Sequence, residues 1–109
     1  MRAALRLQGP AHVVSTACSS SAKVFAAAER AIRLGLIDAA LVGGVDSLCM
    51  TTLYGFKALE LTSQEICRPW DAERAGLSLG EAAAFALTER KDGPARPMGW
   101  LLGAGESPT

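Results

Sequence analysis

The stretch that decides the fold of this chain covers residues 14–21 and reads Val14-Ser15-Thr16-Ala17-Cys18-Ser19-Ser20-Ser21. It connects a β-prone segment, residues 11–17, with residues 22–34, which are rich in helix formers. The sequence therefore predicts a strand that is followed directly by a helix, with a cysteine at the junction.

Cys18 is the candidate nucleophile because of this position. Unpaired backbone N–H groups at the start of a helix carry partial positive charge, which stabilises a thiolate. A sharp turn between a strand and a helix also projects the central side chain away from the sheet and needs small neighbours, here Ala17, Ser19 and Ser20. Most free cysteines in cytoplasmic domains are buried and inert, so position alone leaves a core thiol open as the alternative.

The rest of the chain predicts an α/β protein. Gly35 is expected just after the end of the helix, and residues 39–42 form a short apolar run before Gly43-Gly44, typical of a buried strand. Strand, helix and strand predict a parallel crossover. Further along, we expect a helix over 48–61, an irregular loop over 64–76, a strand over 82–87 and a strand over 98–104; the alanines of 82–87 fit a buried helix nearly as well.

Composition excludes several classes of function. Eleven basic residues balance eleven acidic ones, and the longest basic run is Arg90-Lys91, so a nucleic-acid partner is not expected. No apolar run is long enough for a membrane span, and no signal peptide is recognisable. The three cysteines lack metal-ligand spacing. We expect a reduced, cytoplasmic protein of at most one domain, without a metal.

Residues 15–20, Ser15-Thr16-Ala17-Cys18-Ser19-Ser20, closely resemble the active-site motif of the β-ketoacyl-acyl carrier protein synthases, the ketosynthases of the thiolase-like superfamily. Further matches follow in the family's order, and the resemblance runs from Gly9 to about Gly105. They are Val42-Gly43-Gly44-Val45-Asp46, Gly55-Phe56-x-Ala58-Leu59, and Arg68-Pro69-Trp70-Asp71-x-x-Arg74-x-Gly76-x-x-x-Gly80-Glu81.

The resemblance implies a partial thiolase-like fold, with a mostly parallel sheet and helices on both faces. Residues 1–109 would be part of the N-terminal ketosynthase domain, the segment that bears the nucleophile, with the C-terminal half absent. In the family's sheet the strand before the cysteine is an outer one, separated from the Gly-Gly strand by two strands supplied earlier in the full chain. Residues 11–17 would then lack a ladder neighbour, which suggests a fragment.

The resemblance also implies a reaction, a decarboxylative Claisen condensation in fatty-acid or polyketide biosynthesis. Cys18 would take an acyl group from a carrier-protein thioester, and a carbanion formed from malonyl-carrier protein would attack it. The backbone N–H of Cys18 would be one of two oxyanion donors. Phe56 would lie beside the acyl chain, although a plain core phenylalanine is the alternative. No cofactor is implied.

Two histidines of the family lie in a later half of a longer chain, so the catalytic set here is expected to be incomplete. His12 lies six residues before Cys18, roughly 20 Å away if both lie on one strand, too far for direct pairing. The implied partners are an acyl carrier protein and a second copy paired through strand 11–17. The competing hypothesis is a truncated, non-catalytic module that acts only through association.

The remaining polar residues are interpreted as structural. Arg68, Asp71 and Arg74 are expected to form an ion-pair cluster that organises the loop. Glu81 is expected to be a satisfied structural carboxylate rather than a general base. Cys49 and Cys67 are interpreted as buried or incidental thiols.

Overall fold

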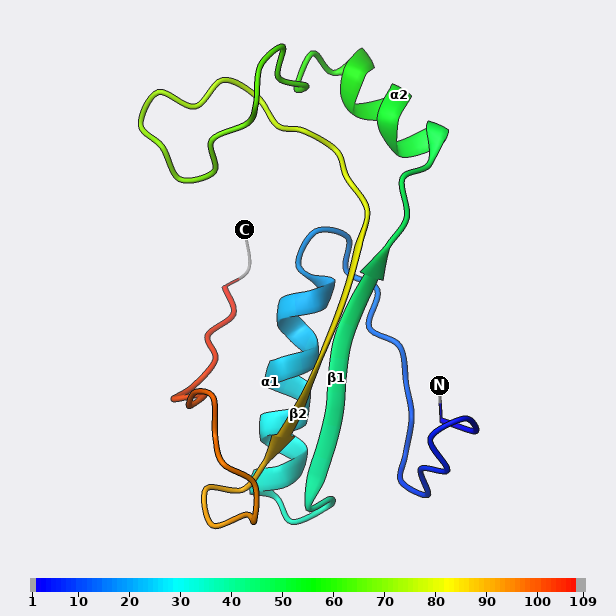
Figure 1. Ribbon diagram of the computed structural model, residues 1–109, viewed down its shortest axis with the longest axis vertical. Coiled ribbons are helices and arrows are strands. Elements are labelled where there is room, and N and C mark those ends of the chain that lie inside the picture. Colours follow the sequence, from blue (N-terminus) through cyan, green and yellow to red (C-terminus); the bar gives the residue numbers. More distant parts are fainter. Residues whose placement is uncertain (1, 108–109) are drawn as a thin grey trace. The chain divides into compact units, whose positions relative to one another are not determined.

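The computed structural model describes residues 2–107. In chain order the elements are α1 (Ser20–Arg33), β1 (Ala39–Asp46), α2 (Met50–Ala58) and β2 (Ala82–Glu89), shown in Figure 1. The chain divides into two compact units. Unit 1 comprises the residues up to Gly44 together with those from Phe85 onward, and unit 2 comprises Val45–Ala84.

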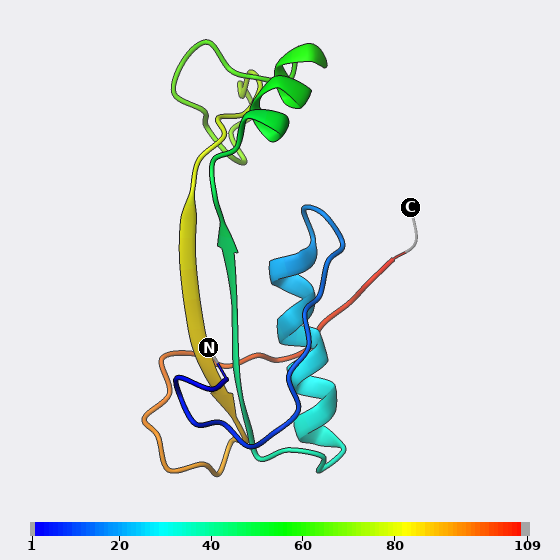
Figure 2. The same cartoon turned by 90° about the vertical axis from the view of Figure 1, so that its right-hand side faces the viewer.

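Unit 1 is built from α1 and the paired strands. β1 and β2 form a two-stranded sheet in which they run in opposite directions, and α1 lies on one face of it (Figures 1 and 2). The buried apolar residues of the described chain are Ala26 and Ala28 of α1 and Val42 of β1. Small side chains at these positions let the helix lie close to the strands, as the alanine-rich composition predicts.

The predictions of the helix over 22–34 and of the strands over 39–42 and 82–87 are confirmed; the helix begins two residues earlier and ends one residue earlier, and both strands extend further at their carboxyl ends. The expected mostly parallel sheet is not confirmed, because the two strands within residues 2–107 are antiparallel. β2 is reached through α2 and a long loop, so the chain can turn back along β1 instead of crossing over in parallel.

Two further predicted strands are wrong. Residues 11–15 and 99–104 are not part of any strand, and Val13 is 91% exposed. The segment 11–17 runs in the same direction as β1 (Figure 1), but β1 takes β2 as its ladder neighbour. A strand needs a neighbouring strand that bonds to its backbone N–H and C=O groups. None of the described residues forms such a ladder with residues 11–15 or 99–104.

The carboxyl end of α1 is closed as the sequence predicts. Gly35 has a positive φ of 68° and donates its N–H to the carbonyl of Ile32, while Leu36 donates to Ala31. These two bonds make a Schellman motif, in which glycine adopts the left-handed conformation without a steric penalty. The turn ends the helix and directs the chain into β1.

The first turn of α1 meets β1 at Gly44. A Cβ atom placed on Gly44 would overlap the hydroxyl of Ser21 and would lie 3.2 Å from the Ser21 Cβ. The close contact with Ser21 gives Gly44 a physical reason: without a side chain, it lets the start of α1 approach the strand.

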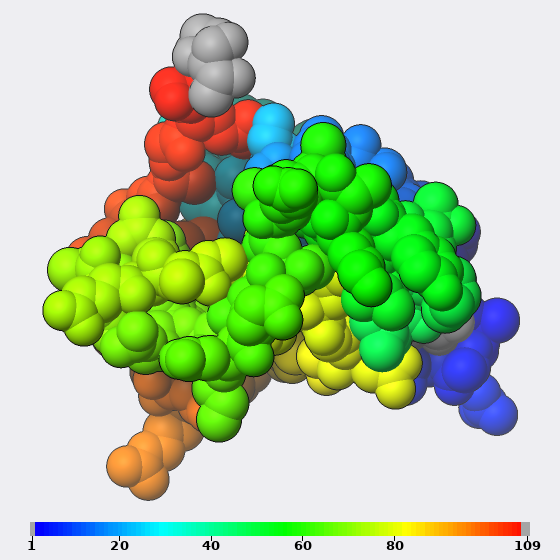
Figure 3. Space-filling view, turned by 90° about the horizontal axis from the view of Figure 1, so that it is seen from above, coloured from blue at the N-terminus to red at the C-terminus, as the bar shows by residue number. Residues whose placement is uncertain are grey.

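Unit 2, drawn in green and yellow in Figure 3, contains α2 and the loop that follows it. α2 covers the middle of the predicted helix 48–61, and the predicted loop over 64–76 is confirmed. Glu60 takes the left-handed conformation, φ 57°, just after α2. Two backbone hydrogen bonds join the ends of the loop. The Ser63 N–H donates to the Leu77 carbonyl at 2.8 Å, and the Leu77 N–H donates to the Leu61 carbonyl at 2.9 Å.

Replacing Gly44 with alanine should lower the free energy of unfolding by about 1–3 kcal/mol, because the new methyl group overpacks the contact with Ser21. Denaturant unfolding followed by circular dichroism measures this. Gly99→Ala, at a position with open space around it, is the matched control. In the double variant Gly44→Ala/Ser21→Ala part of the loss should return, and additive losses would contradict the contact.

Candidate active site

Cys18 lies in the tight turn that leads into α1, two residues before the helix begins, and its side chain is exposed. Ala17 has a φ of 53°, a left-handed conformation that is uncommon for a residue with a Cβ atom. The reversal of the chain at Ala17 separates the extended segment from the helix. The structure places the cysteine just before the helix, as predicted, but the predicted strand on its amino side does not form.

Hydroxyl groups hold this turn together. The Thr16 N–H donates to the Ser20 hydroxyl at 2.8 Å, and that hydroxyl donates to the Ala17 carbonyl at 2.6 Å. The Ser19 hydroxyl donates to the Thr16 carbonyl at 3.0 Å and lies 2.9 Å from the Thr16 hydroxyl. The serine hydroxyls bond back to the turn, and the N-cap residue of α1, Ser19, makes no side-chain capping bond.

The electrostatic setting of Cys18 comes from α1. The first turn of the helix carries no acidic residue, and its N-cap, Ser19, makes no capping bond to the backbone. The unpaired N–H groups of this turn carry partial positive charge, and the carboxylate of Glu106 lies nearby, paired with Lys23 at 3.0 Å. The Cys18 thiol at this end is exposed and accessible to a reactant.

The other residues singled out in the sequence lie outside this turn. Phe56 lies on α2 in unit 2 and is half-buried, so its role beside an acyl chain stays a prediction. His12 is exposed in the extended segment before Cys18.

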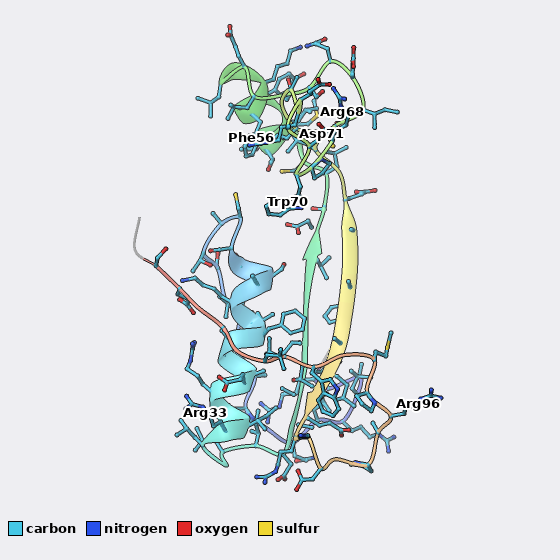
Figure 4. All side chains as sticks on the ribbon, turned by 90° about the vertical axis from the view of Figure 1, so that its left-hand side faces the viewer. Arg33, Phe56, Arg68, Trp70, Asp71 and Arg96 are labelled. Carbon is cyan, nitrogen blue, oxygen red and sulfur yellow. The ribbon has the colours of Figure 1, made fainter. Side chains whose placement is uncertain are left out.

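The prediction of an ion-pair cluster in the loop is confirmed. Arg68 lies 3.7 Å from Asp71 and 3.9 Å from Glu73, and Figure 4 shows Arg68 and Asp71 together. The Arg74 guanidinium donates to the Asp71 carbonyl at 2.9 Å. These groups bond to the loop's own backbone and carboxylates, so they fix the loop rather than form a site.

Glu81 is a structural carboxylate, as predicted. It accepts the N–H of Leu48 at 3.2 Å, a bond that joins the two ends of unit 2 just outside α2 and β2. A carboxylate committed to a backbone amide is poorly suited to act as a general base.

The expectation that Cys49 and Cys67 are buried is wrong. Cys49 is exposed and Cys67 is half-exposed, since both lie at the surface of the small unit 2. The Cys49 thiol lies 3.0 Å from the Thr52 hydroxyl, and hydrogen bonding from Thr52 lowers the pKa of Cys49. A hydrogen bond from Ser78 lowers the pKa of Cys67 in the same way.

Two features are absent from residues 2–107. No group of three or more His, Cys, Asp or Glu side chains there is arranged to hold a metal ion. None of the helices in that range has the length and apolar character needed to cross a membrane.

Comparison with known proteins decides the family. Residues 2–93 match the family described as "Beta-ketoacyl synthase, N-terminal domain". The chain belongs to the β-ketoacyl synthase family. It is 40% identical over 86 residues to nodulation protein E of Rhizobium leguminosarum bv. trifolii, covering 78% of this chain and 21% of that protein. With 3-oxoacyl-[acyl-carrier-protein] synthase 2 of Rhizobium meliloti (strain 1021) it shares 38% identity over 92 residues, 77% of this chain and 22% of the relative.

A solved ketosynthase has the same fold. The ketosynthase ApeO, in complex with its chain length factor ApeC from Xenorhabdus doucetiae, matches with a TM-score of 0.75 and 41% identity over 85% of this chain and 23% of that chain. The resemblance inferred from the sequence is confirmed. The fold of this chain corresponds to part of the α/β fold of a ketosynthase. The chain spans about a fifth of the length of the curated relatives that it matches.

The Thr52 contact predicts a change in the reactivity of Cys49. Thr52→Val removes the hydroxyl that stabilises the thiolate, so the pKa of Cys49 should rise and its alkylation by iodoacetamide should shift to higher pH. Mass spectrometry of peptides alkylated across a pH series measures this. The neighbouring Thr51→Val is the control, and an unchanged Cys49 profile in Thr52→Val would contradict the bond.

Proposed function

We propose that this chain is the nucleophile-bearing part of a condensing enzyme and that Cys18 is its acylated residue. The observation that carries the proposal is the exposed Cys18 thiol at the amino end of α1, within a stretch that matches the family. The substrate class is an acyl thioester of a carrier protein. Fatty-acid and polyketide chain elongation both use this chemistry.

In the proposed reaction the Cys18 sulfur attacks the thioester carbonyl, a new C–S bond forms, and the bond to the carrier's sulfur breaks. The thiol proton of Cys18 ends on the departing carrier thiol. Loss of CO2 from a malonyl thioester then supplies a carbanion that forms the new C–C bond and releases Cys18. The backbone N–H of Cys18 is the proposed oxyanion donor within this chain.

The other parts of the proposal rest on the same family relation. An acyl carrier protein is the proposed partner, and Phe56 is the proposed neighbour of the acyl chain. No residue of this chain is assigned the decarboxylation step, and the chain spans about a fifth of the length of its relatives. All three cysteines are free, and a reducing cytoplasm would keep the Cys18 thiol available.

Incubation with an octanoyl-acyl carrier protein should add one octanoyl group to the protein, seen by intact mass spectrometry. Cys18→Ala should lose the adduct, whereas Cys49→Ala and Cys67→Ala, matched changes at the other surface thiols, should keep it. A parent protein that melts cooperatively but takes up no octanoyl group would overturn acylation and would leave association as the chain's role.

A second copy is the proposed neighbour of segment 11–17. Val13 is 91% exposed, and the segment is β-prone yet forms no strand within the described chain. Sedimentation should therefore show a dimer whose fraction rises with protein concentration. A charge at the exposed position, Val13→Lys, should reduce association, and a monomer at every concentration would count against the dimer.

A further inference from the structure

The hydroxyl of Ser20 bonds to two backbone groups on the amino side of Cys18. As acceptor it takes the N–H of Thr16 at 2.8 Å, and as donor it reaches the carbonyl of Ala17 at 2.6 Å. Ser20 is the first residue of α1 and is half-buried. One side chain therefore links the start of the helix to the backbone on the amino side of the cysteine.

Ala17 needs this support because it has a φ of 53°. The left-handed conformation is unfavourable for a residue with a Cβ atom and persists only where surrounding contacts hold it. Its carbonyl accepts both the Ser20 hydroxyl and the Ser20 N–H, the latter at 3.1 Å. Two bonds from one residue thus fix the peptide that joins Ala17 to Cys18.

The direction of the Cys18 side chain depends on this backbone. Among the hydrogen bonds of residues 2–107 none involves the Cys18 sulfur. A sulfur without a side-chain partner is aimed by the φ and ψ angles of its own turn. A reacting atom displaced by about 1 Å can lose around a hundredfold in rate.

We propose that Ser20 is a positioning residue for Cys18: its hydroxyl holds the turn that presents the thiol at the amino end of α1. This inference rests on the proposed acylation of Cys18. Ser20 touches neither the sulfur nor the acyl group; it acts through the backbone of Thr16 and Ala17.

The rate of octanoyl transfer from octanoyl-acyl carrier protein to Cys18 tests the role. Ser20→Ala should lower the maximal rate by about tenfold, the factor expected when two hydrogen bonds are lost, with the half-saturating concentration unchanged. Ser20→Thr keeps the hydroxyl and should restore the rate to within about threefold. Ser47→Ala, the same change at an exposed serine after β1, should react like the parent protein.

Amide hydrogen exchange separates this inference from the proposed function. In Ser20→Ala the Thr16 N–H loses its acceptor and should exchange faster, whereas Ser20→Thr should keep the protection. Alkylation of Cys18 by iodoacetamide, followed beside Cys67 in the same sample, gives a reactivity that needs no acyl donor.

If the parent protein takes up no octanoyl group, the proposed acylation is overturned. The exchange and alkylation measurements still decide the role of Ser20. Unchanged Thr16 exchange together with an unchanged Cys18 alkylation rate in Ser20→Ala would overturn positioning by Ser20. Equal slowing in Ser20→Ala and Ser20→Thr would also overturn it, because the hydroxyl would then not be the cause.

Discussion

The close approach of α1 to β1 at Gly44 is the contact on which the rest of unit 1 depends. A side chain at this position would overlap the hydroxyl of Ser21 in the first turn of α1. This contact holds the start of α1 against β1. The turn that precedes α1 is therefore anchored at its helix end, and the chain reverses direction at Ala17. The Cys18 thiol is then left at the surface, beside free N–H groups of the helix.

Unit 1 and unit 2 bury little apolar surface. Ala26, Ala28 and Val42 are the buried apolar residues of the described chain, whereas large side chains such as Trp70, Met98 and Leu102 are almost fully exposed. A two-stranded sheet is only marginally stable by itself in water. So many exposed apolar side chains are typical of a surface that is covered by another part of a protein or by a partner.

Local signals explain the parts of the fold that the sequence predicts well. Helix formers followed by glycine predict α1 and its Schellman end at Gly35, which the structure confirms. The polar stretch with Arg68 and Asp71 predicts a loop held by its own ion pairs, also confirmed. The motif around Cys18 predicts the family, and a match over residues 2–93 bears this out. These features need only residues close in sequence.

Pairing between distant segments could not be predicted in this way. Residues 11–17 have the composition of a strand, but composition does not specify which segment will hydrogen-bond to their backbone. In the structure β1 pairs with β2 and not with residues 11–17. A serine at the start of a helix usually bonds to the helix's N–H groups, but the hydroxyls of Ser19 and Ser20 do not. With Ala17 in the left-handed conformation they reach Thr16 and Ala17 instead.

The sequence by itself therefore determined the helix, the loop, the family and the place of Cys18 at a junction, because each depends on neighbouring residues or on an ordered set of motifs. Only the tertiary structure decided the antiparallel direction of β2, the exposure of the three thiols and the Ser20 bonds. The reason is physical: burial, strand direction and the choice of a hydrogen-bond partner depend on how segments meet in space.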